Sequence, residues 1–267
     1  MGMIGALVAR LLSCYVRRCP PHRGMYRVVK ALAALCPGQP VLSRYGVLMV
    51  CRPRDLTFLF AILGRHDDVY QTLKEKLRPD MCLLDVGANQ GVFTLVGALA
   101  VGKEGRVLSF EPSRREFRDL LRNLEINGVD NVLPFFCGLS DAGGTGLLQV
   151  APDVHSGKSH YVDGAGQLSL QLDLREWDSH IQSLIGGRET WIKIDVEGYE
   201  VRVIRSLEKV LCAPATRGVI VEIEERQLSA QGFHAADIYQ EMARMGYTPF
   251  FGTEKSVYNE IFLRNKD

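Results

Sequence analysis

Two apolar runs joined by a glycine turn constrain the fold of this chain more than any other feature. Residues 83–91 read LLDVGANQG, and residues 107–111 form a second apolar run that ends at Glu111. Gly87 permits a sharp turn after the first strand, and Gly91 would allow the start of a helix to approach a ligand. Glu111, at the tip of the second strand, would accept hydrogen bonds from both hydroxyls of a ribose. This order of elements is typical of an adenosine-binding α/β half-fold.

Strand and helix patterns alternate along most of the chain. Such alternation predicts a mostly parallel sheet with helices on both faces, and two late runs (247–251 and 257–264) predict a closing pair whose last strand is antiparallel. Glycine-rich residues 143–176 interrupt the pattern and predict a β-hairpin insertion. Strands are expected at 82–86, 106–111, 132–137, 191–195 and 218–224, and helices at 55–63 (with Asp55 as N-cap), 91–100, 114–126, 199–211 and 235–245.

The charge is distributed unevenly. Nine of the 32 Lys and Arg residues lie in residues 1–54, which contain none of the 31 acids, so the rest of the chain is net acidic. An acidic main domain argues against a nucleic-acid-binding groove. We therefore predict a basic helical extension over residues 1–46 and a single domain over residues 47–267.

The extension has three interpretations. Apolar residues recur at helical spacing (Ile4, Leu7, Val8, Leu11, Leu12 and Tyr15), with Arg10, Ser13 and Arg17 on the opposite face. The helix either docks on the domain, lies in a membrane surface through residues 1–35, or is a mitochondrial-type presequence, and the lack of acids favours the last two. The seven cysteines show no pairing pattern, which favours a reducing, cytoplasmic location with or without membrane contact.

Four motifs carry a family resemblance. Residues 85–91 (DVGANQG), 110–113 (FEPS), 139–141 (LSD) and 192–200 (IKIDVEGYE) resemble the FkbM family over roughly residues 68–264. Members of that family are class I S-adenosylmethionine-dependent methyltransferases, mostly assigned to O-methylation of natural products and glycans. The resemblance implies a Rossmann-like seven-stranded methyltransferase sheet, mostly parallel with the last strand antiparallel. It also implies S-adenosylmethionine as cofactor and a small-molecule or glycan hydroxyl as acceptor.

Ligands of such sheets bind at the carboxyl ends of the strands, where this chain places acids. S-adenosylmethionine carries a sulfonium and an ammonium group, so an acidic crevice suits it. We expect Asp85 and the amides of Gly87, Ala88, Asn89 and Gly91 to hold the methionine end, Glu111 the ribose, and Ser140 and Asp141 the adenine. An open alternative is that Asp85 caps the turn and Asp141 belongs only to a tight turn.

Three carboxylates are candidates for catalysis: Asp195, Glu197 and Glu222. A general base assists an alcohol nucleophile by removing its proton, and a carboxylate suits an oxygen acceptor. Glu222 is an alternative base, or would join Asp195 on a magnesium-like ion; without a third ligand in sight we predict no metal. Glu197 has a purely structural alternative, that of binding the turn at Gly198.

Other side chains leave further alternatives open. Lys193 is expected on the other face of its strand, in a structural role. His155 and His160, in the insertion, are either bases or exposed hairpin residues. Two other functions compete with methyl transfer. One is an NAD(P)-dependent oxidoreductase, although the glycine turn lacks the full GxGxxG. The other is a catalytically silent membrane-surface scaffold.

Overall fold

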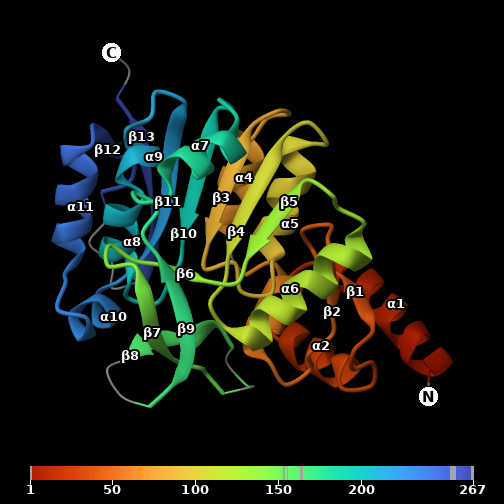
Figure 1. Ribbon diagram of the computed structural model, residues 1–267. Coiled ribbons are helices and arrows are strands. Elements are labelled where there is room, and N and C mark those ends of the chain that lie inside the picture. The colour runs from red at the N-terminus through yellow and green to blue at the C-terminus, as the bar shows by residue number, and fades with distance from the viewer. Residues whose placement is uncertain are drawn as a thin grey trace.

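A seven-stranded sheet forms the centre of the computed structural model, which describes residues 2–65, 67–152, 154, 156–162, 165–252 and 257–265. The strand order is β12-β13-β11-β10-β3-β4-β5 (Figure 1). β13 is antiparallel to both neighbours, and the other pairs are parallel, so the predicted sheet is confirmed. The strands are β3 (Cys82–Val86), β4 (Arg106–Phe110), β5 (Val132–Phe135), β10 (Thr190–Ile194), β11 (Thr216–Glu224), β12 (Tyr247–Pro249) and β13 (Val257–Arg264).

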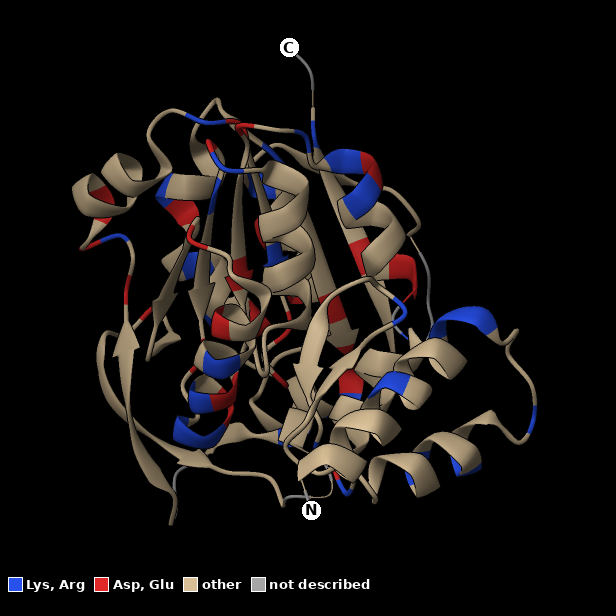
Figure 2. Ribbon diagram, turned by 90° about the vertical axis from the view of Figure 1, so that its right-hand side faces the viewer, with Lys and Arg blue, Asp and Glu red and all other residues tan. Residues whose placement is uncertain are grey.

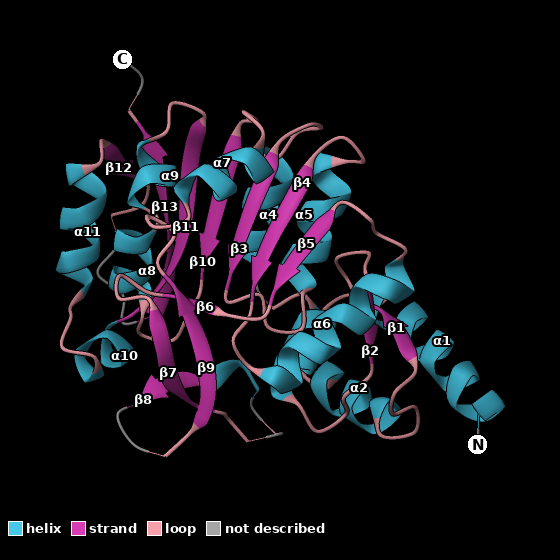
Figure 3. Cartoon of the chain, viewed as in Figure 1, coloured by secondary structure: helices cyan, strands magenta, loops and turns pink. Residues whose placement is uncertain are grey.

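Helices cover both faces of this sheet, and each face has its own hydrophobic core (Figure 3). Successive residues of a strand point to opposite faces. Leu83 and Trp191 therefore pack into one core, and their neighbours Leu84 and Ile192 pack into the other. All five residues of β3 are buried, as in parallel sheets covered on both sides. The helices are α4 (Asp67–Lys76), α5 (Val92–Val101), α6 (Arg114–Asn127), α7 (Asp178–Ile185), α8 (Glu200–Ser206), α9 (Glu208–Cys212), α10 (Glu225–Ala230) and α11 (Ala235–Arg244).

The predicted insertion is a small second sheet of order β6-β9-β7-β8, which is more than a single hairpin. β7 pairs antiparallel with both β8 and β9. Below the central sheet in Figure 1, these strands extend beyond its carboxyl edge. The elements are β6 (Gly138–Leu139), β7 (Gly144–Gln149), η1 (Ser156–Lys158), β8 (His160–Val162) and β9 (Gln167–Leu172).

The N-terminal segment docks on the domain. It comprises α1 (Gly2–Arg18), α2 (Met25–Ala33) and the hairpin β1 (Pro40–Leu42)–β2 (Leu48–Val50), followed by α3 (Leu56–Leu63). The side chain of Asn127 in α6 accepts from Leu48 N and donates to Leu48 O, both at 2.8 Å. The predicted boundary between residues 46 and 47 falls in the turn of this hairpin, and residues on both sides share one core. A domain boundary there stays a prediction.

The face by which α1 docks differs from the predicted one. α1 buries Gly5, Ala9, Leu12 and Val16, whereas Ile4, Leu7 and Leu11 are exposed. Hydrogen bonds that Ser13 Oγ accepts from Leu42 N and that Arg44 donates to Val16 O fix the rotational setting of the helix. The apolar spacing was therefore real, but these tertiary contacts decided which face is buried. Among the described residues, no helix has the length and apolar content needed to cross a bilayer.

Candidate active site

A cavity of about 270 Å³ opens at the carboxyl edge of the central sheet. The ends of β3, β4, β10 and β11 form its floor, α3 forms one wall, and the η1–β8 segment of the insertion faces the floor. The floor was predictable from the sequence, because parallel strands place their carboxyl ends at one edge. The walls include residues that were not predicted as part of the site: Thr57, Phe60, Lys158, Tyr161 and Tyr199.

The glycine turn after β3 is held by backbone contacts on two sides. The amides of Gly87 and Ala88 both donate to Phe110 O at 3.0 Å, which attaches the turn to β4. Gly87 has φ +81°, and a Cβ there would lie 1.8 Å from Asp195 O. Gly87, Ala88 and Asn89 line the cavity, as a cofactor-binding turn requires. Their binding role stays a prediction.

Gly91 packs closely against helix α6. It begins α5 with φ +84°, and a Cβ there would lie 2.3 Å from a methyl carbon of Leu120 in α6. The described residues that line the cavity do not include Gly91. Its role in the approach of a ligand stays a prediction.

Glu111 lies buried on the cavity wall. Its Oε2 accepts from Asn89 N at 2.7 Å, and its Oε1 accepts from Ser113 N at 2.8 Å. Burial raises the pKa of Glu111 to about 8, although these two amide donors oppose the shift. Each carboxylate oxygen has two lone pairs, so each retains one acceptor site for a hydroxyl group. This geometry supports the predicted role at a ribose.

Asp85 and Lys193 form a buried pair below the cavity floor. Asp85 accepts from Thr94 Oγ1 at 2.6 Å, and its other oxygen lies 3.6 Å from Lys193 Nζ. Asp85 is not among the described lining residues, so the expectation that it touches the methionine end is replaced by one of positioning Lys193. Lys193 does line the cavity, which corrects its predicted place on the other face. The reason is simple: residues 193 and 195 are two apart on one chain and project the same way.

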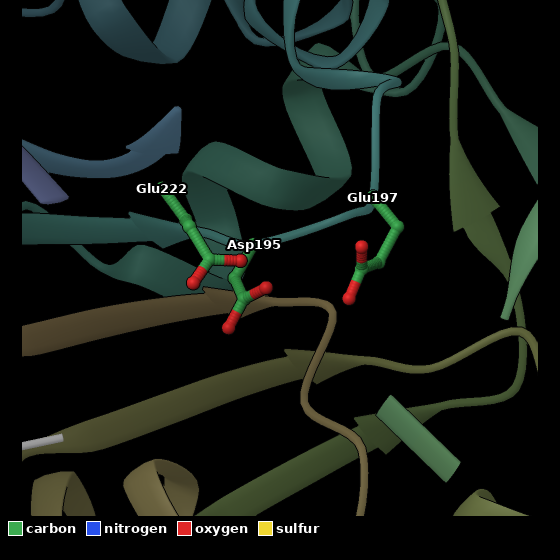
Figure 4. Close-up of side chains that lie close together, drawn as sticks. All are labelled: Asp195, Glu197 and Glu222. Atoms are coloured by element: carbon green, nitrogen blue, oxygen red, sulfur yellow. The ribbon is translucent and has the colours of Figure 1, made fainter. Parts of the chain in front are cut away.

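Asp195, Glu197 and Glu222 converge on the cavity floor, where one oxygen of each lies within 4.8 Å of the others (Figure 4). Lys193 Nζ lies 3.1 Å from Asp195 Oδ2. The negative charge of Asp195, followed by burial, raises the pKa of Glu222 to about 10, and the two side chains are hydrogen-bonded. Burial lowers the pKa of Lys193, but Asp195 and Asp85 outweigh it and raise the value to about 12. The pattern is that of a protonated Glu222 beside an ion pair.

Glu197 connects the floor to the insertion. Its Oε2 accepts from Lys158 Nζ and from Gln227 Nε2, both at 2.9 Å, and Lys158 also lies 2.8 Å from Glu224. Burial and the nearby Asp195 raise the pKa of Glu197 to about 8, against the effect of Lys158. No local sequence signal links residue 158 to residue 197, so this ion pair was not predictable.

Asp141 is paired with arginines of helix α8. Asp141 lies 3.3 Å from Arg202 and 3.7 Å from Arg205, both on α8, and neither it nor Ser140 is among the described lining residues. Gly138 and Leu139 of β6 line the cavity instead. The amide of Ser140 donates to Leu172 O of β9 at 3.0 Å. A role of Ser140 and Asp141 at the adenine stays a prediction.

The insertion histidines have different outcomes. His155 lies outside the described residues. His160 lines the cavity, and its Nδ1 lies 3.1 Å from Lys158 O. A role as base for either histidine stays a prediction.

One buried carboxylate ties three segments of the site together. Asp55 caps α3 by accepting from Thr57 N at 3.0 Å, as predicted. It also accepts from Gln90 Nε2 of the glycine turn at 2.5 Å and from Ser156 Oγ of the insertion at 2.7 Å. Asp55 thus fixes α3, the turn and the insertion relative to one another. The capping position was predictable, but the contact with residue 156 was not.

The donor set fits S-adenosylmethionine. Four acids line the cavity (Glu111, Asp195, Glu197 and Glu222), and its two lysines are both in ion pairs. Glu111 offers oxygen acceptors for ribose hydroxyls, the carboxylate of Asp195 suits a cationic sulfonium group, and Val86, Phe110 and Leu139 offer apolar surface for a purine. Asp195, Glu197 and Glu222 lie close enough to offer three oxygen ligands to a metal ion, one more than was apparent from the sequence. Two of these acids are already paired with lysines, Asp195 with Lys193 and Glu197 with Lys158. The prediction of no metal stays a prediction.

Comparison with known proteins identifies the family. A family model described as the methyltransferase FkbM domain matches residues 85–249, more than half of the chain. Hexuronic acid methyltransferase AglP of Haloferax volcanii is 28% identical over 161 residues, covering 60% of this chain and 63% of that protein. Methyltransferase 1 of Beauveria bassiana is 26% identical over 148 residues, covering 48% of this chain and 59% of that protein. The chain spans about three fifths of the length of these two curated relatives.

Among solved structures, methyltransferase FkbM from Methylobacillus flagellatus KT superposes with a TM-score of 0.45 at 15% identity, covering 96% of this chain and 58% of that one. The family match spans the glycine turn, Glu111 and the IKIDVEG motif, and leaves no support for the oxidoreductase alternative. It confirms the family and the cofactor that the motifs predicted. This chain therefore belongs to the FkbM family of S-adenosylmethionine-dependent methyltransferases.

Proposed function

We propose that this chain O-methylates a hydroxyl group of a glycan or natural-product intermediate in the cytoplasm. The observation that best supports this proposal is the position of Asp195, which faces the cavity between Lys193 and the protonated carboxyl group of Glu222. When bound, S-adenosylmethionine supplies an activated methyl group. The chain's own residues must then bind the acceptor, align it and remove its proton.

Asp195 is the base in this proposal. Its charge raises the pKa values of both Glu222 and Glu197, so Asp195 is the member of the cluster that carries the negative charge at neutral pH. Removal of the hydroxyl proton as the new C–O bond forms contributes about 10²- to 10⁴-fold to such reactions. Lys193 and Glu222 are positioning residues, because both hold Asp195 in place.

A sugar acceptor is supported from two directions. The relative AglP is named a hexuronic acid methyltransferase. A second cavity of about 260 Å³ adjoins the first and shares His160, Tyr161 and Tyr199 with it. Its further lining includes Gln227 and Gln231, and the Tyr161 and Tyr199 ring centroids lie 4.8 Å apart. Amide groups and aromatic faces together suit the hydroxyls and C–H groups of a sugar ring.

The cytoplasmic part of the proposal rests on the cysteines. All seven are described and free. Their odd number and scattered spacing show no disulfide framework. This pattern supports a reducing compartment.

Calorimetry and mass spectrometry test the function. S-adenosylmethionine should bind the wild type saturably and Glu111→Ala much more weakly. Glycan extracts incubated with cofactor and wild type should gain the mass of methyl groups, and linkage analysis should place these on oxygen. Asp195→Asn should bind cofactor normally but lose about 10²-fold or more of the turnover. Cofactor binding with no methylated product would favour the silent scaffold, and methyl groups on nitrogen would refute O-methylation.

A further inference from the structure

Helix α1 is apolar on two opposite faces. The inner face packs on the domain through Gly5, Ala9, Leu12 and Val16. The outer stripe, which we define as Met3, Ile4, Leu7 and Leu11, is exposed by 90%, 72%, 59% and 56%. These positions recur at three- and four-residue intervals and so share one face of the helix. A solvent-facing helix surface is normally polar, and nothing among the described residues covers this stripe.

The docked helix cannot rotate to bury the stripe. Ser13 Oγ accepts from Leu42 N at 2.8 Å, which fixes the middle of α1 to strand β1. At the end of α1, the Arg44 guanidinium donates to Val16 O and to Cys19 O, both at 2.8 Å. These bonds hold one rotational setting of the helix. The outer stripe is therefore presented to the surroundings as a fixed feature of the fold.

The surface around the stripe is basic. Arg10, Arg17 and Arg18 of α1 are exposed, as are Arg27 and Lys30 of the adjoining α2. Residues 1–54 contain no acid, and Figure 2 shows blue segments on the helices in the lower part of the molecule, on the side of the N-terminus. An apolar stripe beside arginines matches a helix that lies in the plane of an anionic membrane, where apolar side chains enter the acyl boundary and cations meet lipid phosphates.

We propose that the outer stripe and the neighbouring arginines form a peripheral binding site for an anionic lipid surface. Helix α1 is too short and too interrupted to span a bilayer, so it lies in the interface. Helix α2 contacts both α1 and α3, and α3 lines the active-site cavity. The lipid surface would therefore lie one helix away from a wall of the cavity. This proposal does not depend on the identity of the methyl acceptor.

Vesicle flotation of the full chain tests the proposal. Wild type should float with vesicles that contain phosphatidylglycerol and remain in solution with phosphatidylcholine alone. Each basic residue near an anionic surface strengthens partitioning by about fivefold. High salt should release the protein from the vesicles, because it screens this attraction. The double variant Leu7→Gln/Leu11→Gln should lose about tenfold or more of the partitioning, since it removes apolar area without changing charge.

The matched control is Leu99→Gln/Leu121→Gln, which changes two exposed leucines on α5 and α6. It should float like the wild type, and all variants should keep the melting temperature and the affinity for S-adenosylmethionine of the wild type. Failure of the wild type to float with anionic vesicles overturns the proposal, as does equal flotation of the Leu7/Leu11 variant. A dimer in light scattering that dissociates in this variant would assign the stripe to a second copy instead.

Discussion

Glu222→Gln should stabilise the protein at neutral pH, although it alters the centre of the site. Glu222 has an ordinary pKa of 4.5, and Asp195 and burial raise it to about 10 in the folded chain. Between these values the unfolded state releases a proton that the folded state retains. A group whose pKa is higher in the folded than in the unfolded chain contributes its full stabilisation of the folded state below the unfolded pKa. This contribution is lost as the pH rises toward the folded pKa. Wild type therefore loses stability across this window.

The magnitude follows from the shift. Each pH unit between the two pKa values is equivalent to about 1.4 kcal/mol. pH 7 lies about 2.5 units above the pKa of Glu222 in the unfolded chain. Ionisation of Glu222 in the unfolded chain therefore lowers the unfolding free energy of wild type by about 3 kcal/mol at this pH. Glutamine has the shape of the protonated acid, retains an N–H donor for Asp195 and cannot ionise. The variant should therefore unfold with a free energy about 3 kcal/mol higher than that of wild type at pH 7.

Urea denaturation of wild type and Glu222→Gln between pH 5 and pH 8 measures the effect. The difference in unfolding free energy should grow with pH by about 1.4 kcal/mol per unit. Glu189→Gln, an exposed acid paired with Arg217, should show almost no such slope. Infrared spectra at pH 9, above the pKa of about 8 of Glu111 and Glu197 but below that of Glu222, should show a protonated carboxyl band in wild type that Glu222→Gln lacks. A flat difference, or the absence of this band, would refute the assignment of the proton to Glu222.

Three further variants probe the site. Gly87→Ala should cost several kcal/mol or prevent folding, whereas Gly246→Ala, with the same φ of +81° but no atom within 4 Å, should cost only about 1–2 kcal/mol; equal melting temperatures would contradict the clash with the β10 end. Lys193→Met leaves buried acids unpaired and should cost roughly 3–5 kcal/mol in urea denaturation, against less than about 1 kcal/mol for Arg217→Ala; similar losses would disprove the pairing. Asp55→Ala should raise proteolysis of the insertion, and unchanged cleavage rates would contradict its tethering role.

Features that depend on neighbouring residues were predictable. Gly87 and the apolar run before it specify a strand and a turn, because only glycine tolerates φ +81° so close to another backbone. Asp55 was a recognisable N-cap for a similar reason, since its partner lies two residues away. The alternation of strands and helices then predicted the carboxyl edge, where Glu111, Asp195, Glu197 and Glu222 all line one cavity.

Features that depend on distant residues were decided only by the tertiary structure. Asp141 is absent from the described cavity lining and pairs with two arginines of α8. Lys158 lines the cavity because the insertion folds over the floor. The protonation pattern of the acids likewise exists only after β10 and β11 pair and bring Glu222 beside Asp195. Local steric and hydrogen-bonding preferences are written in consecutive residues, whereas burial and charge proximity arise when segments far apart in the chain come into contact.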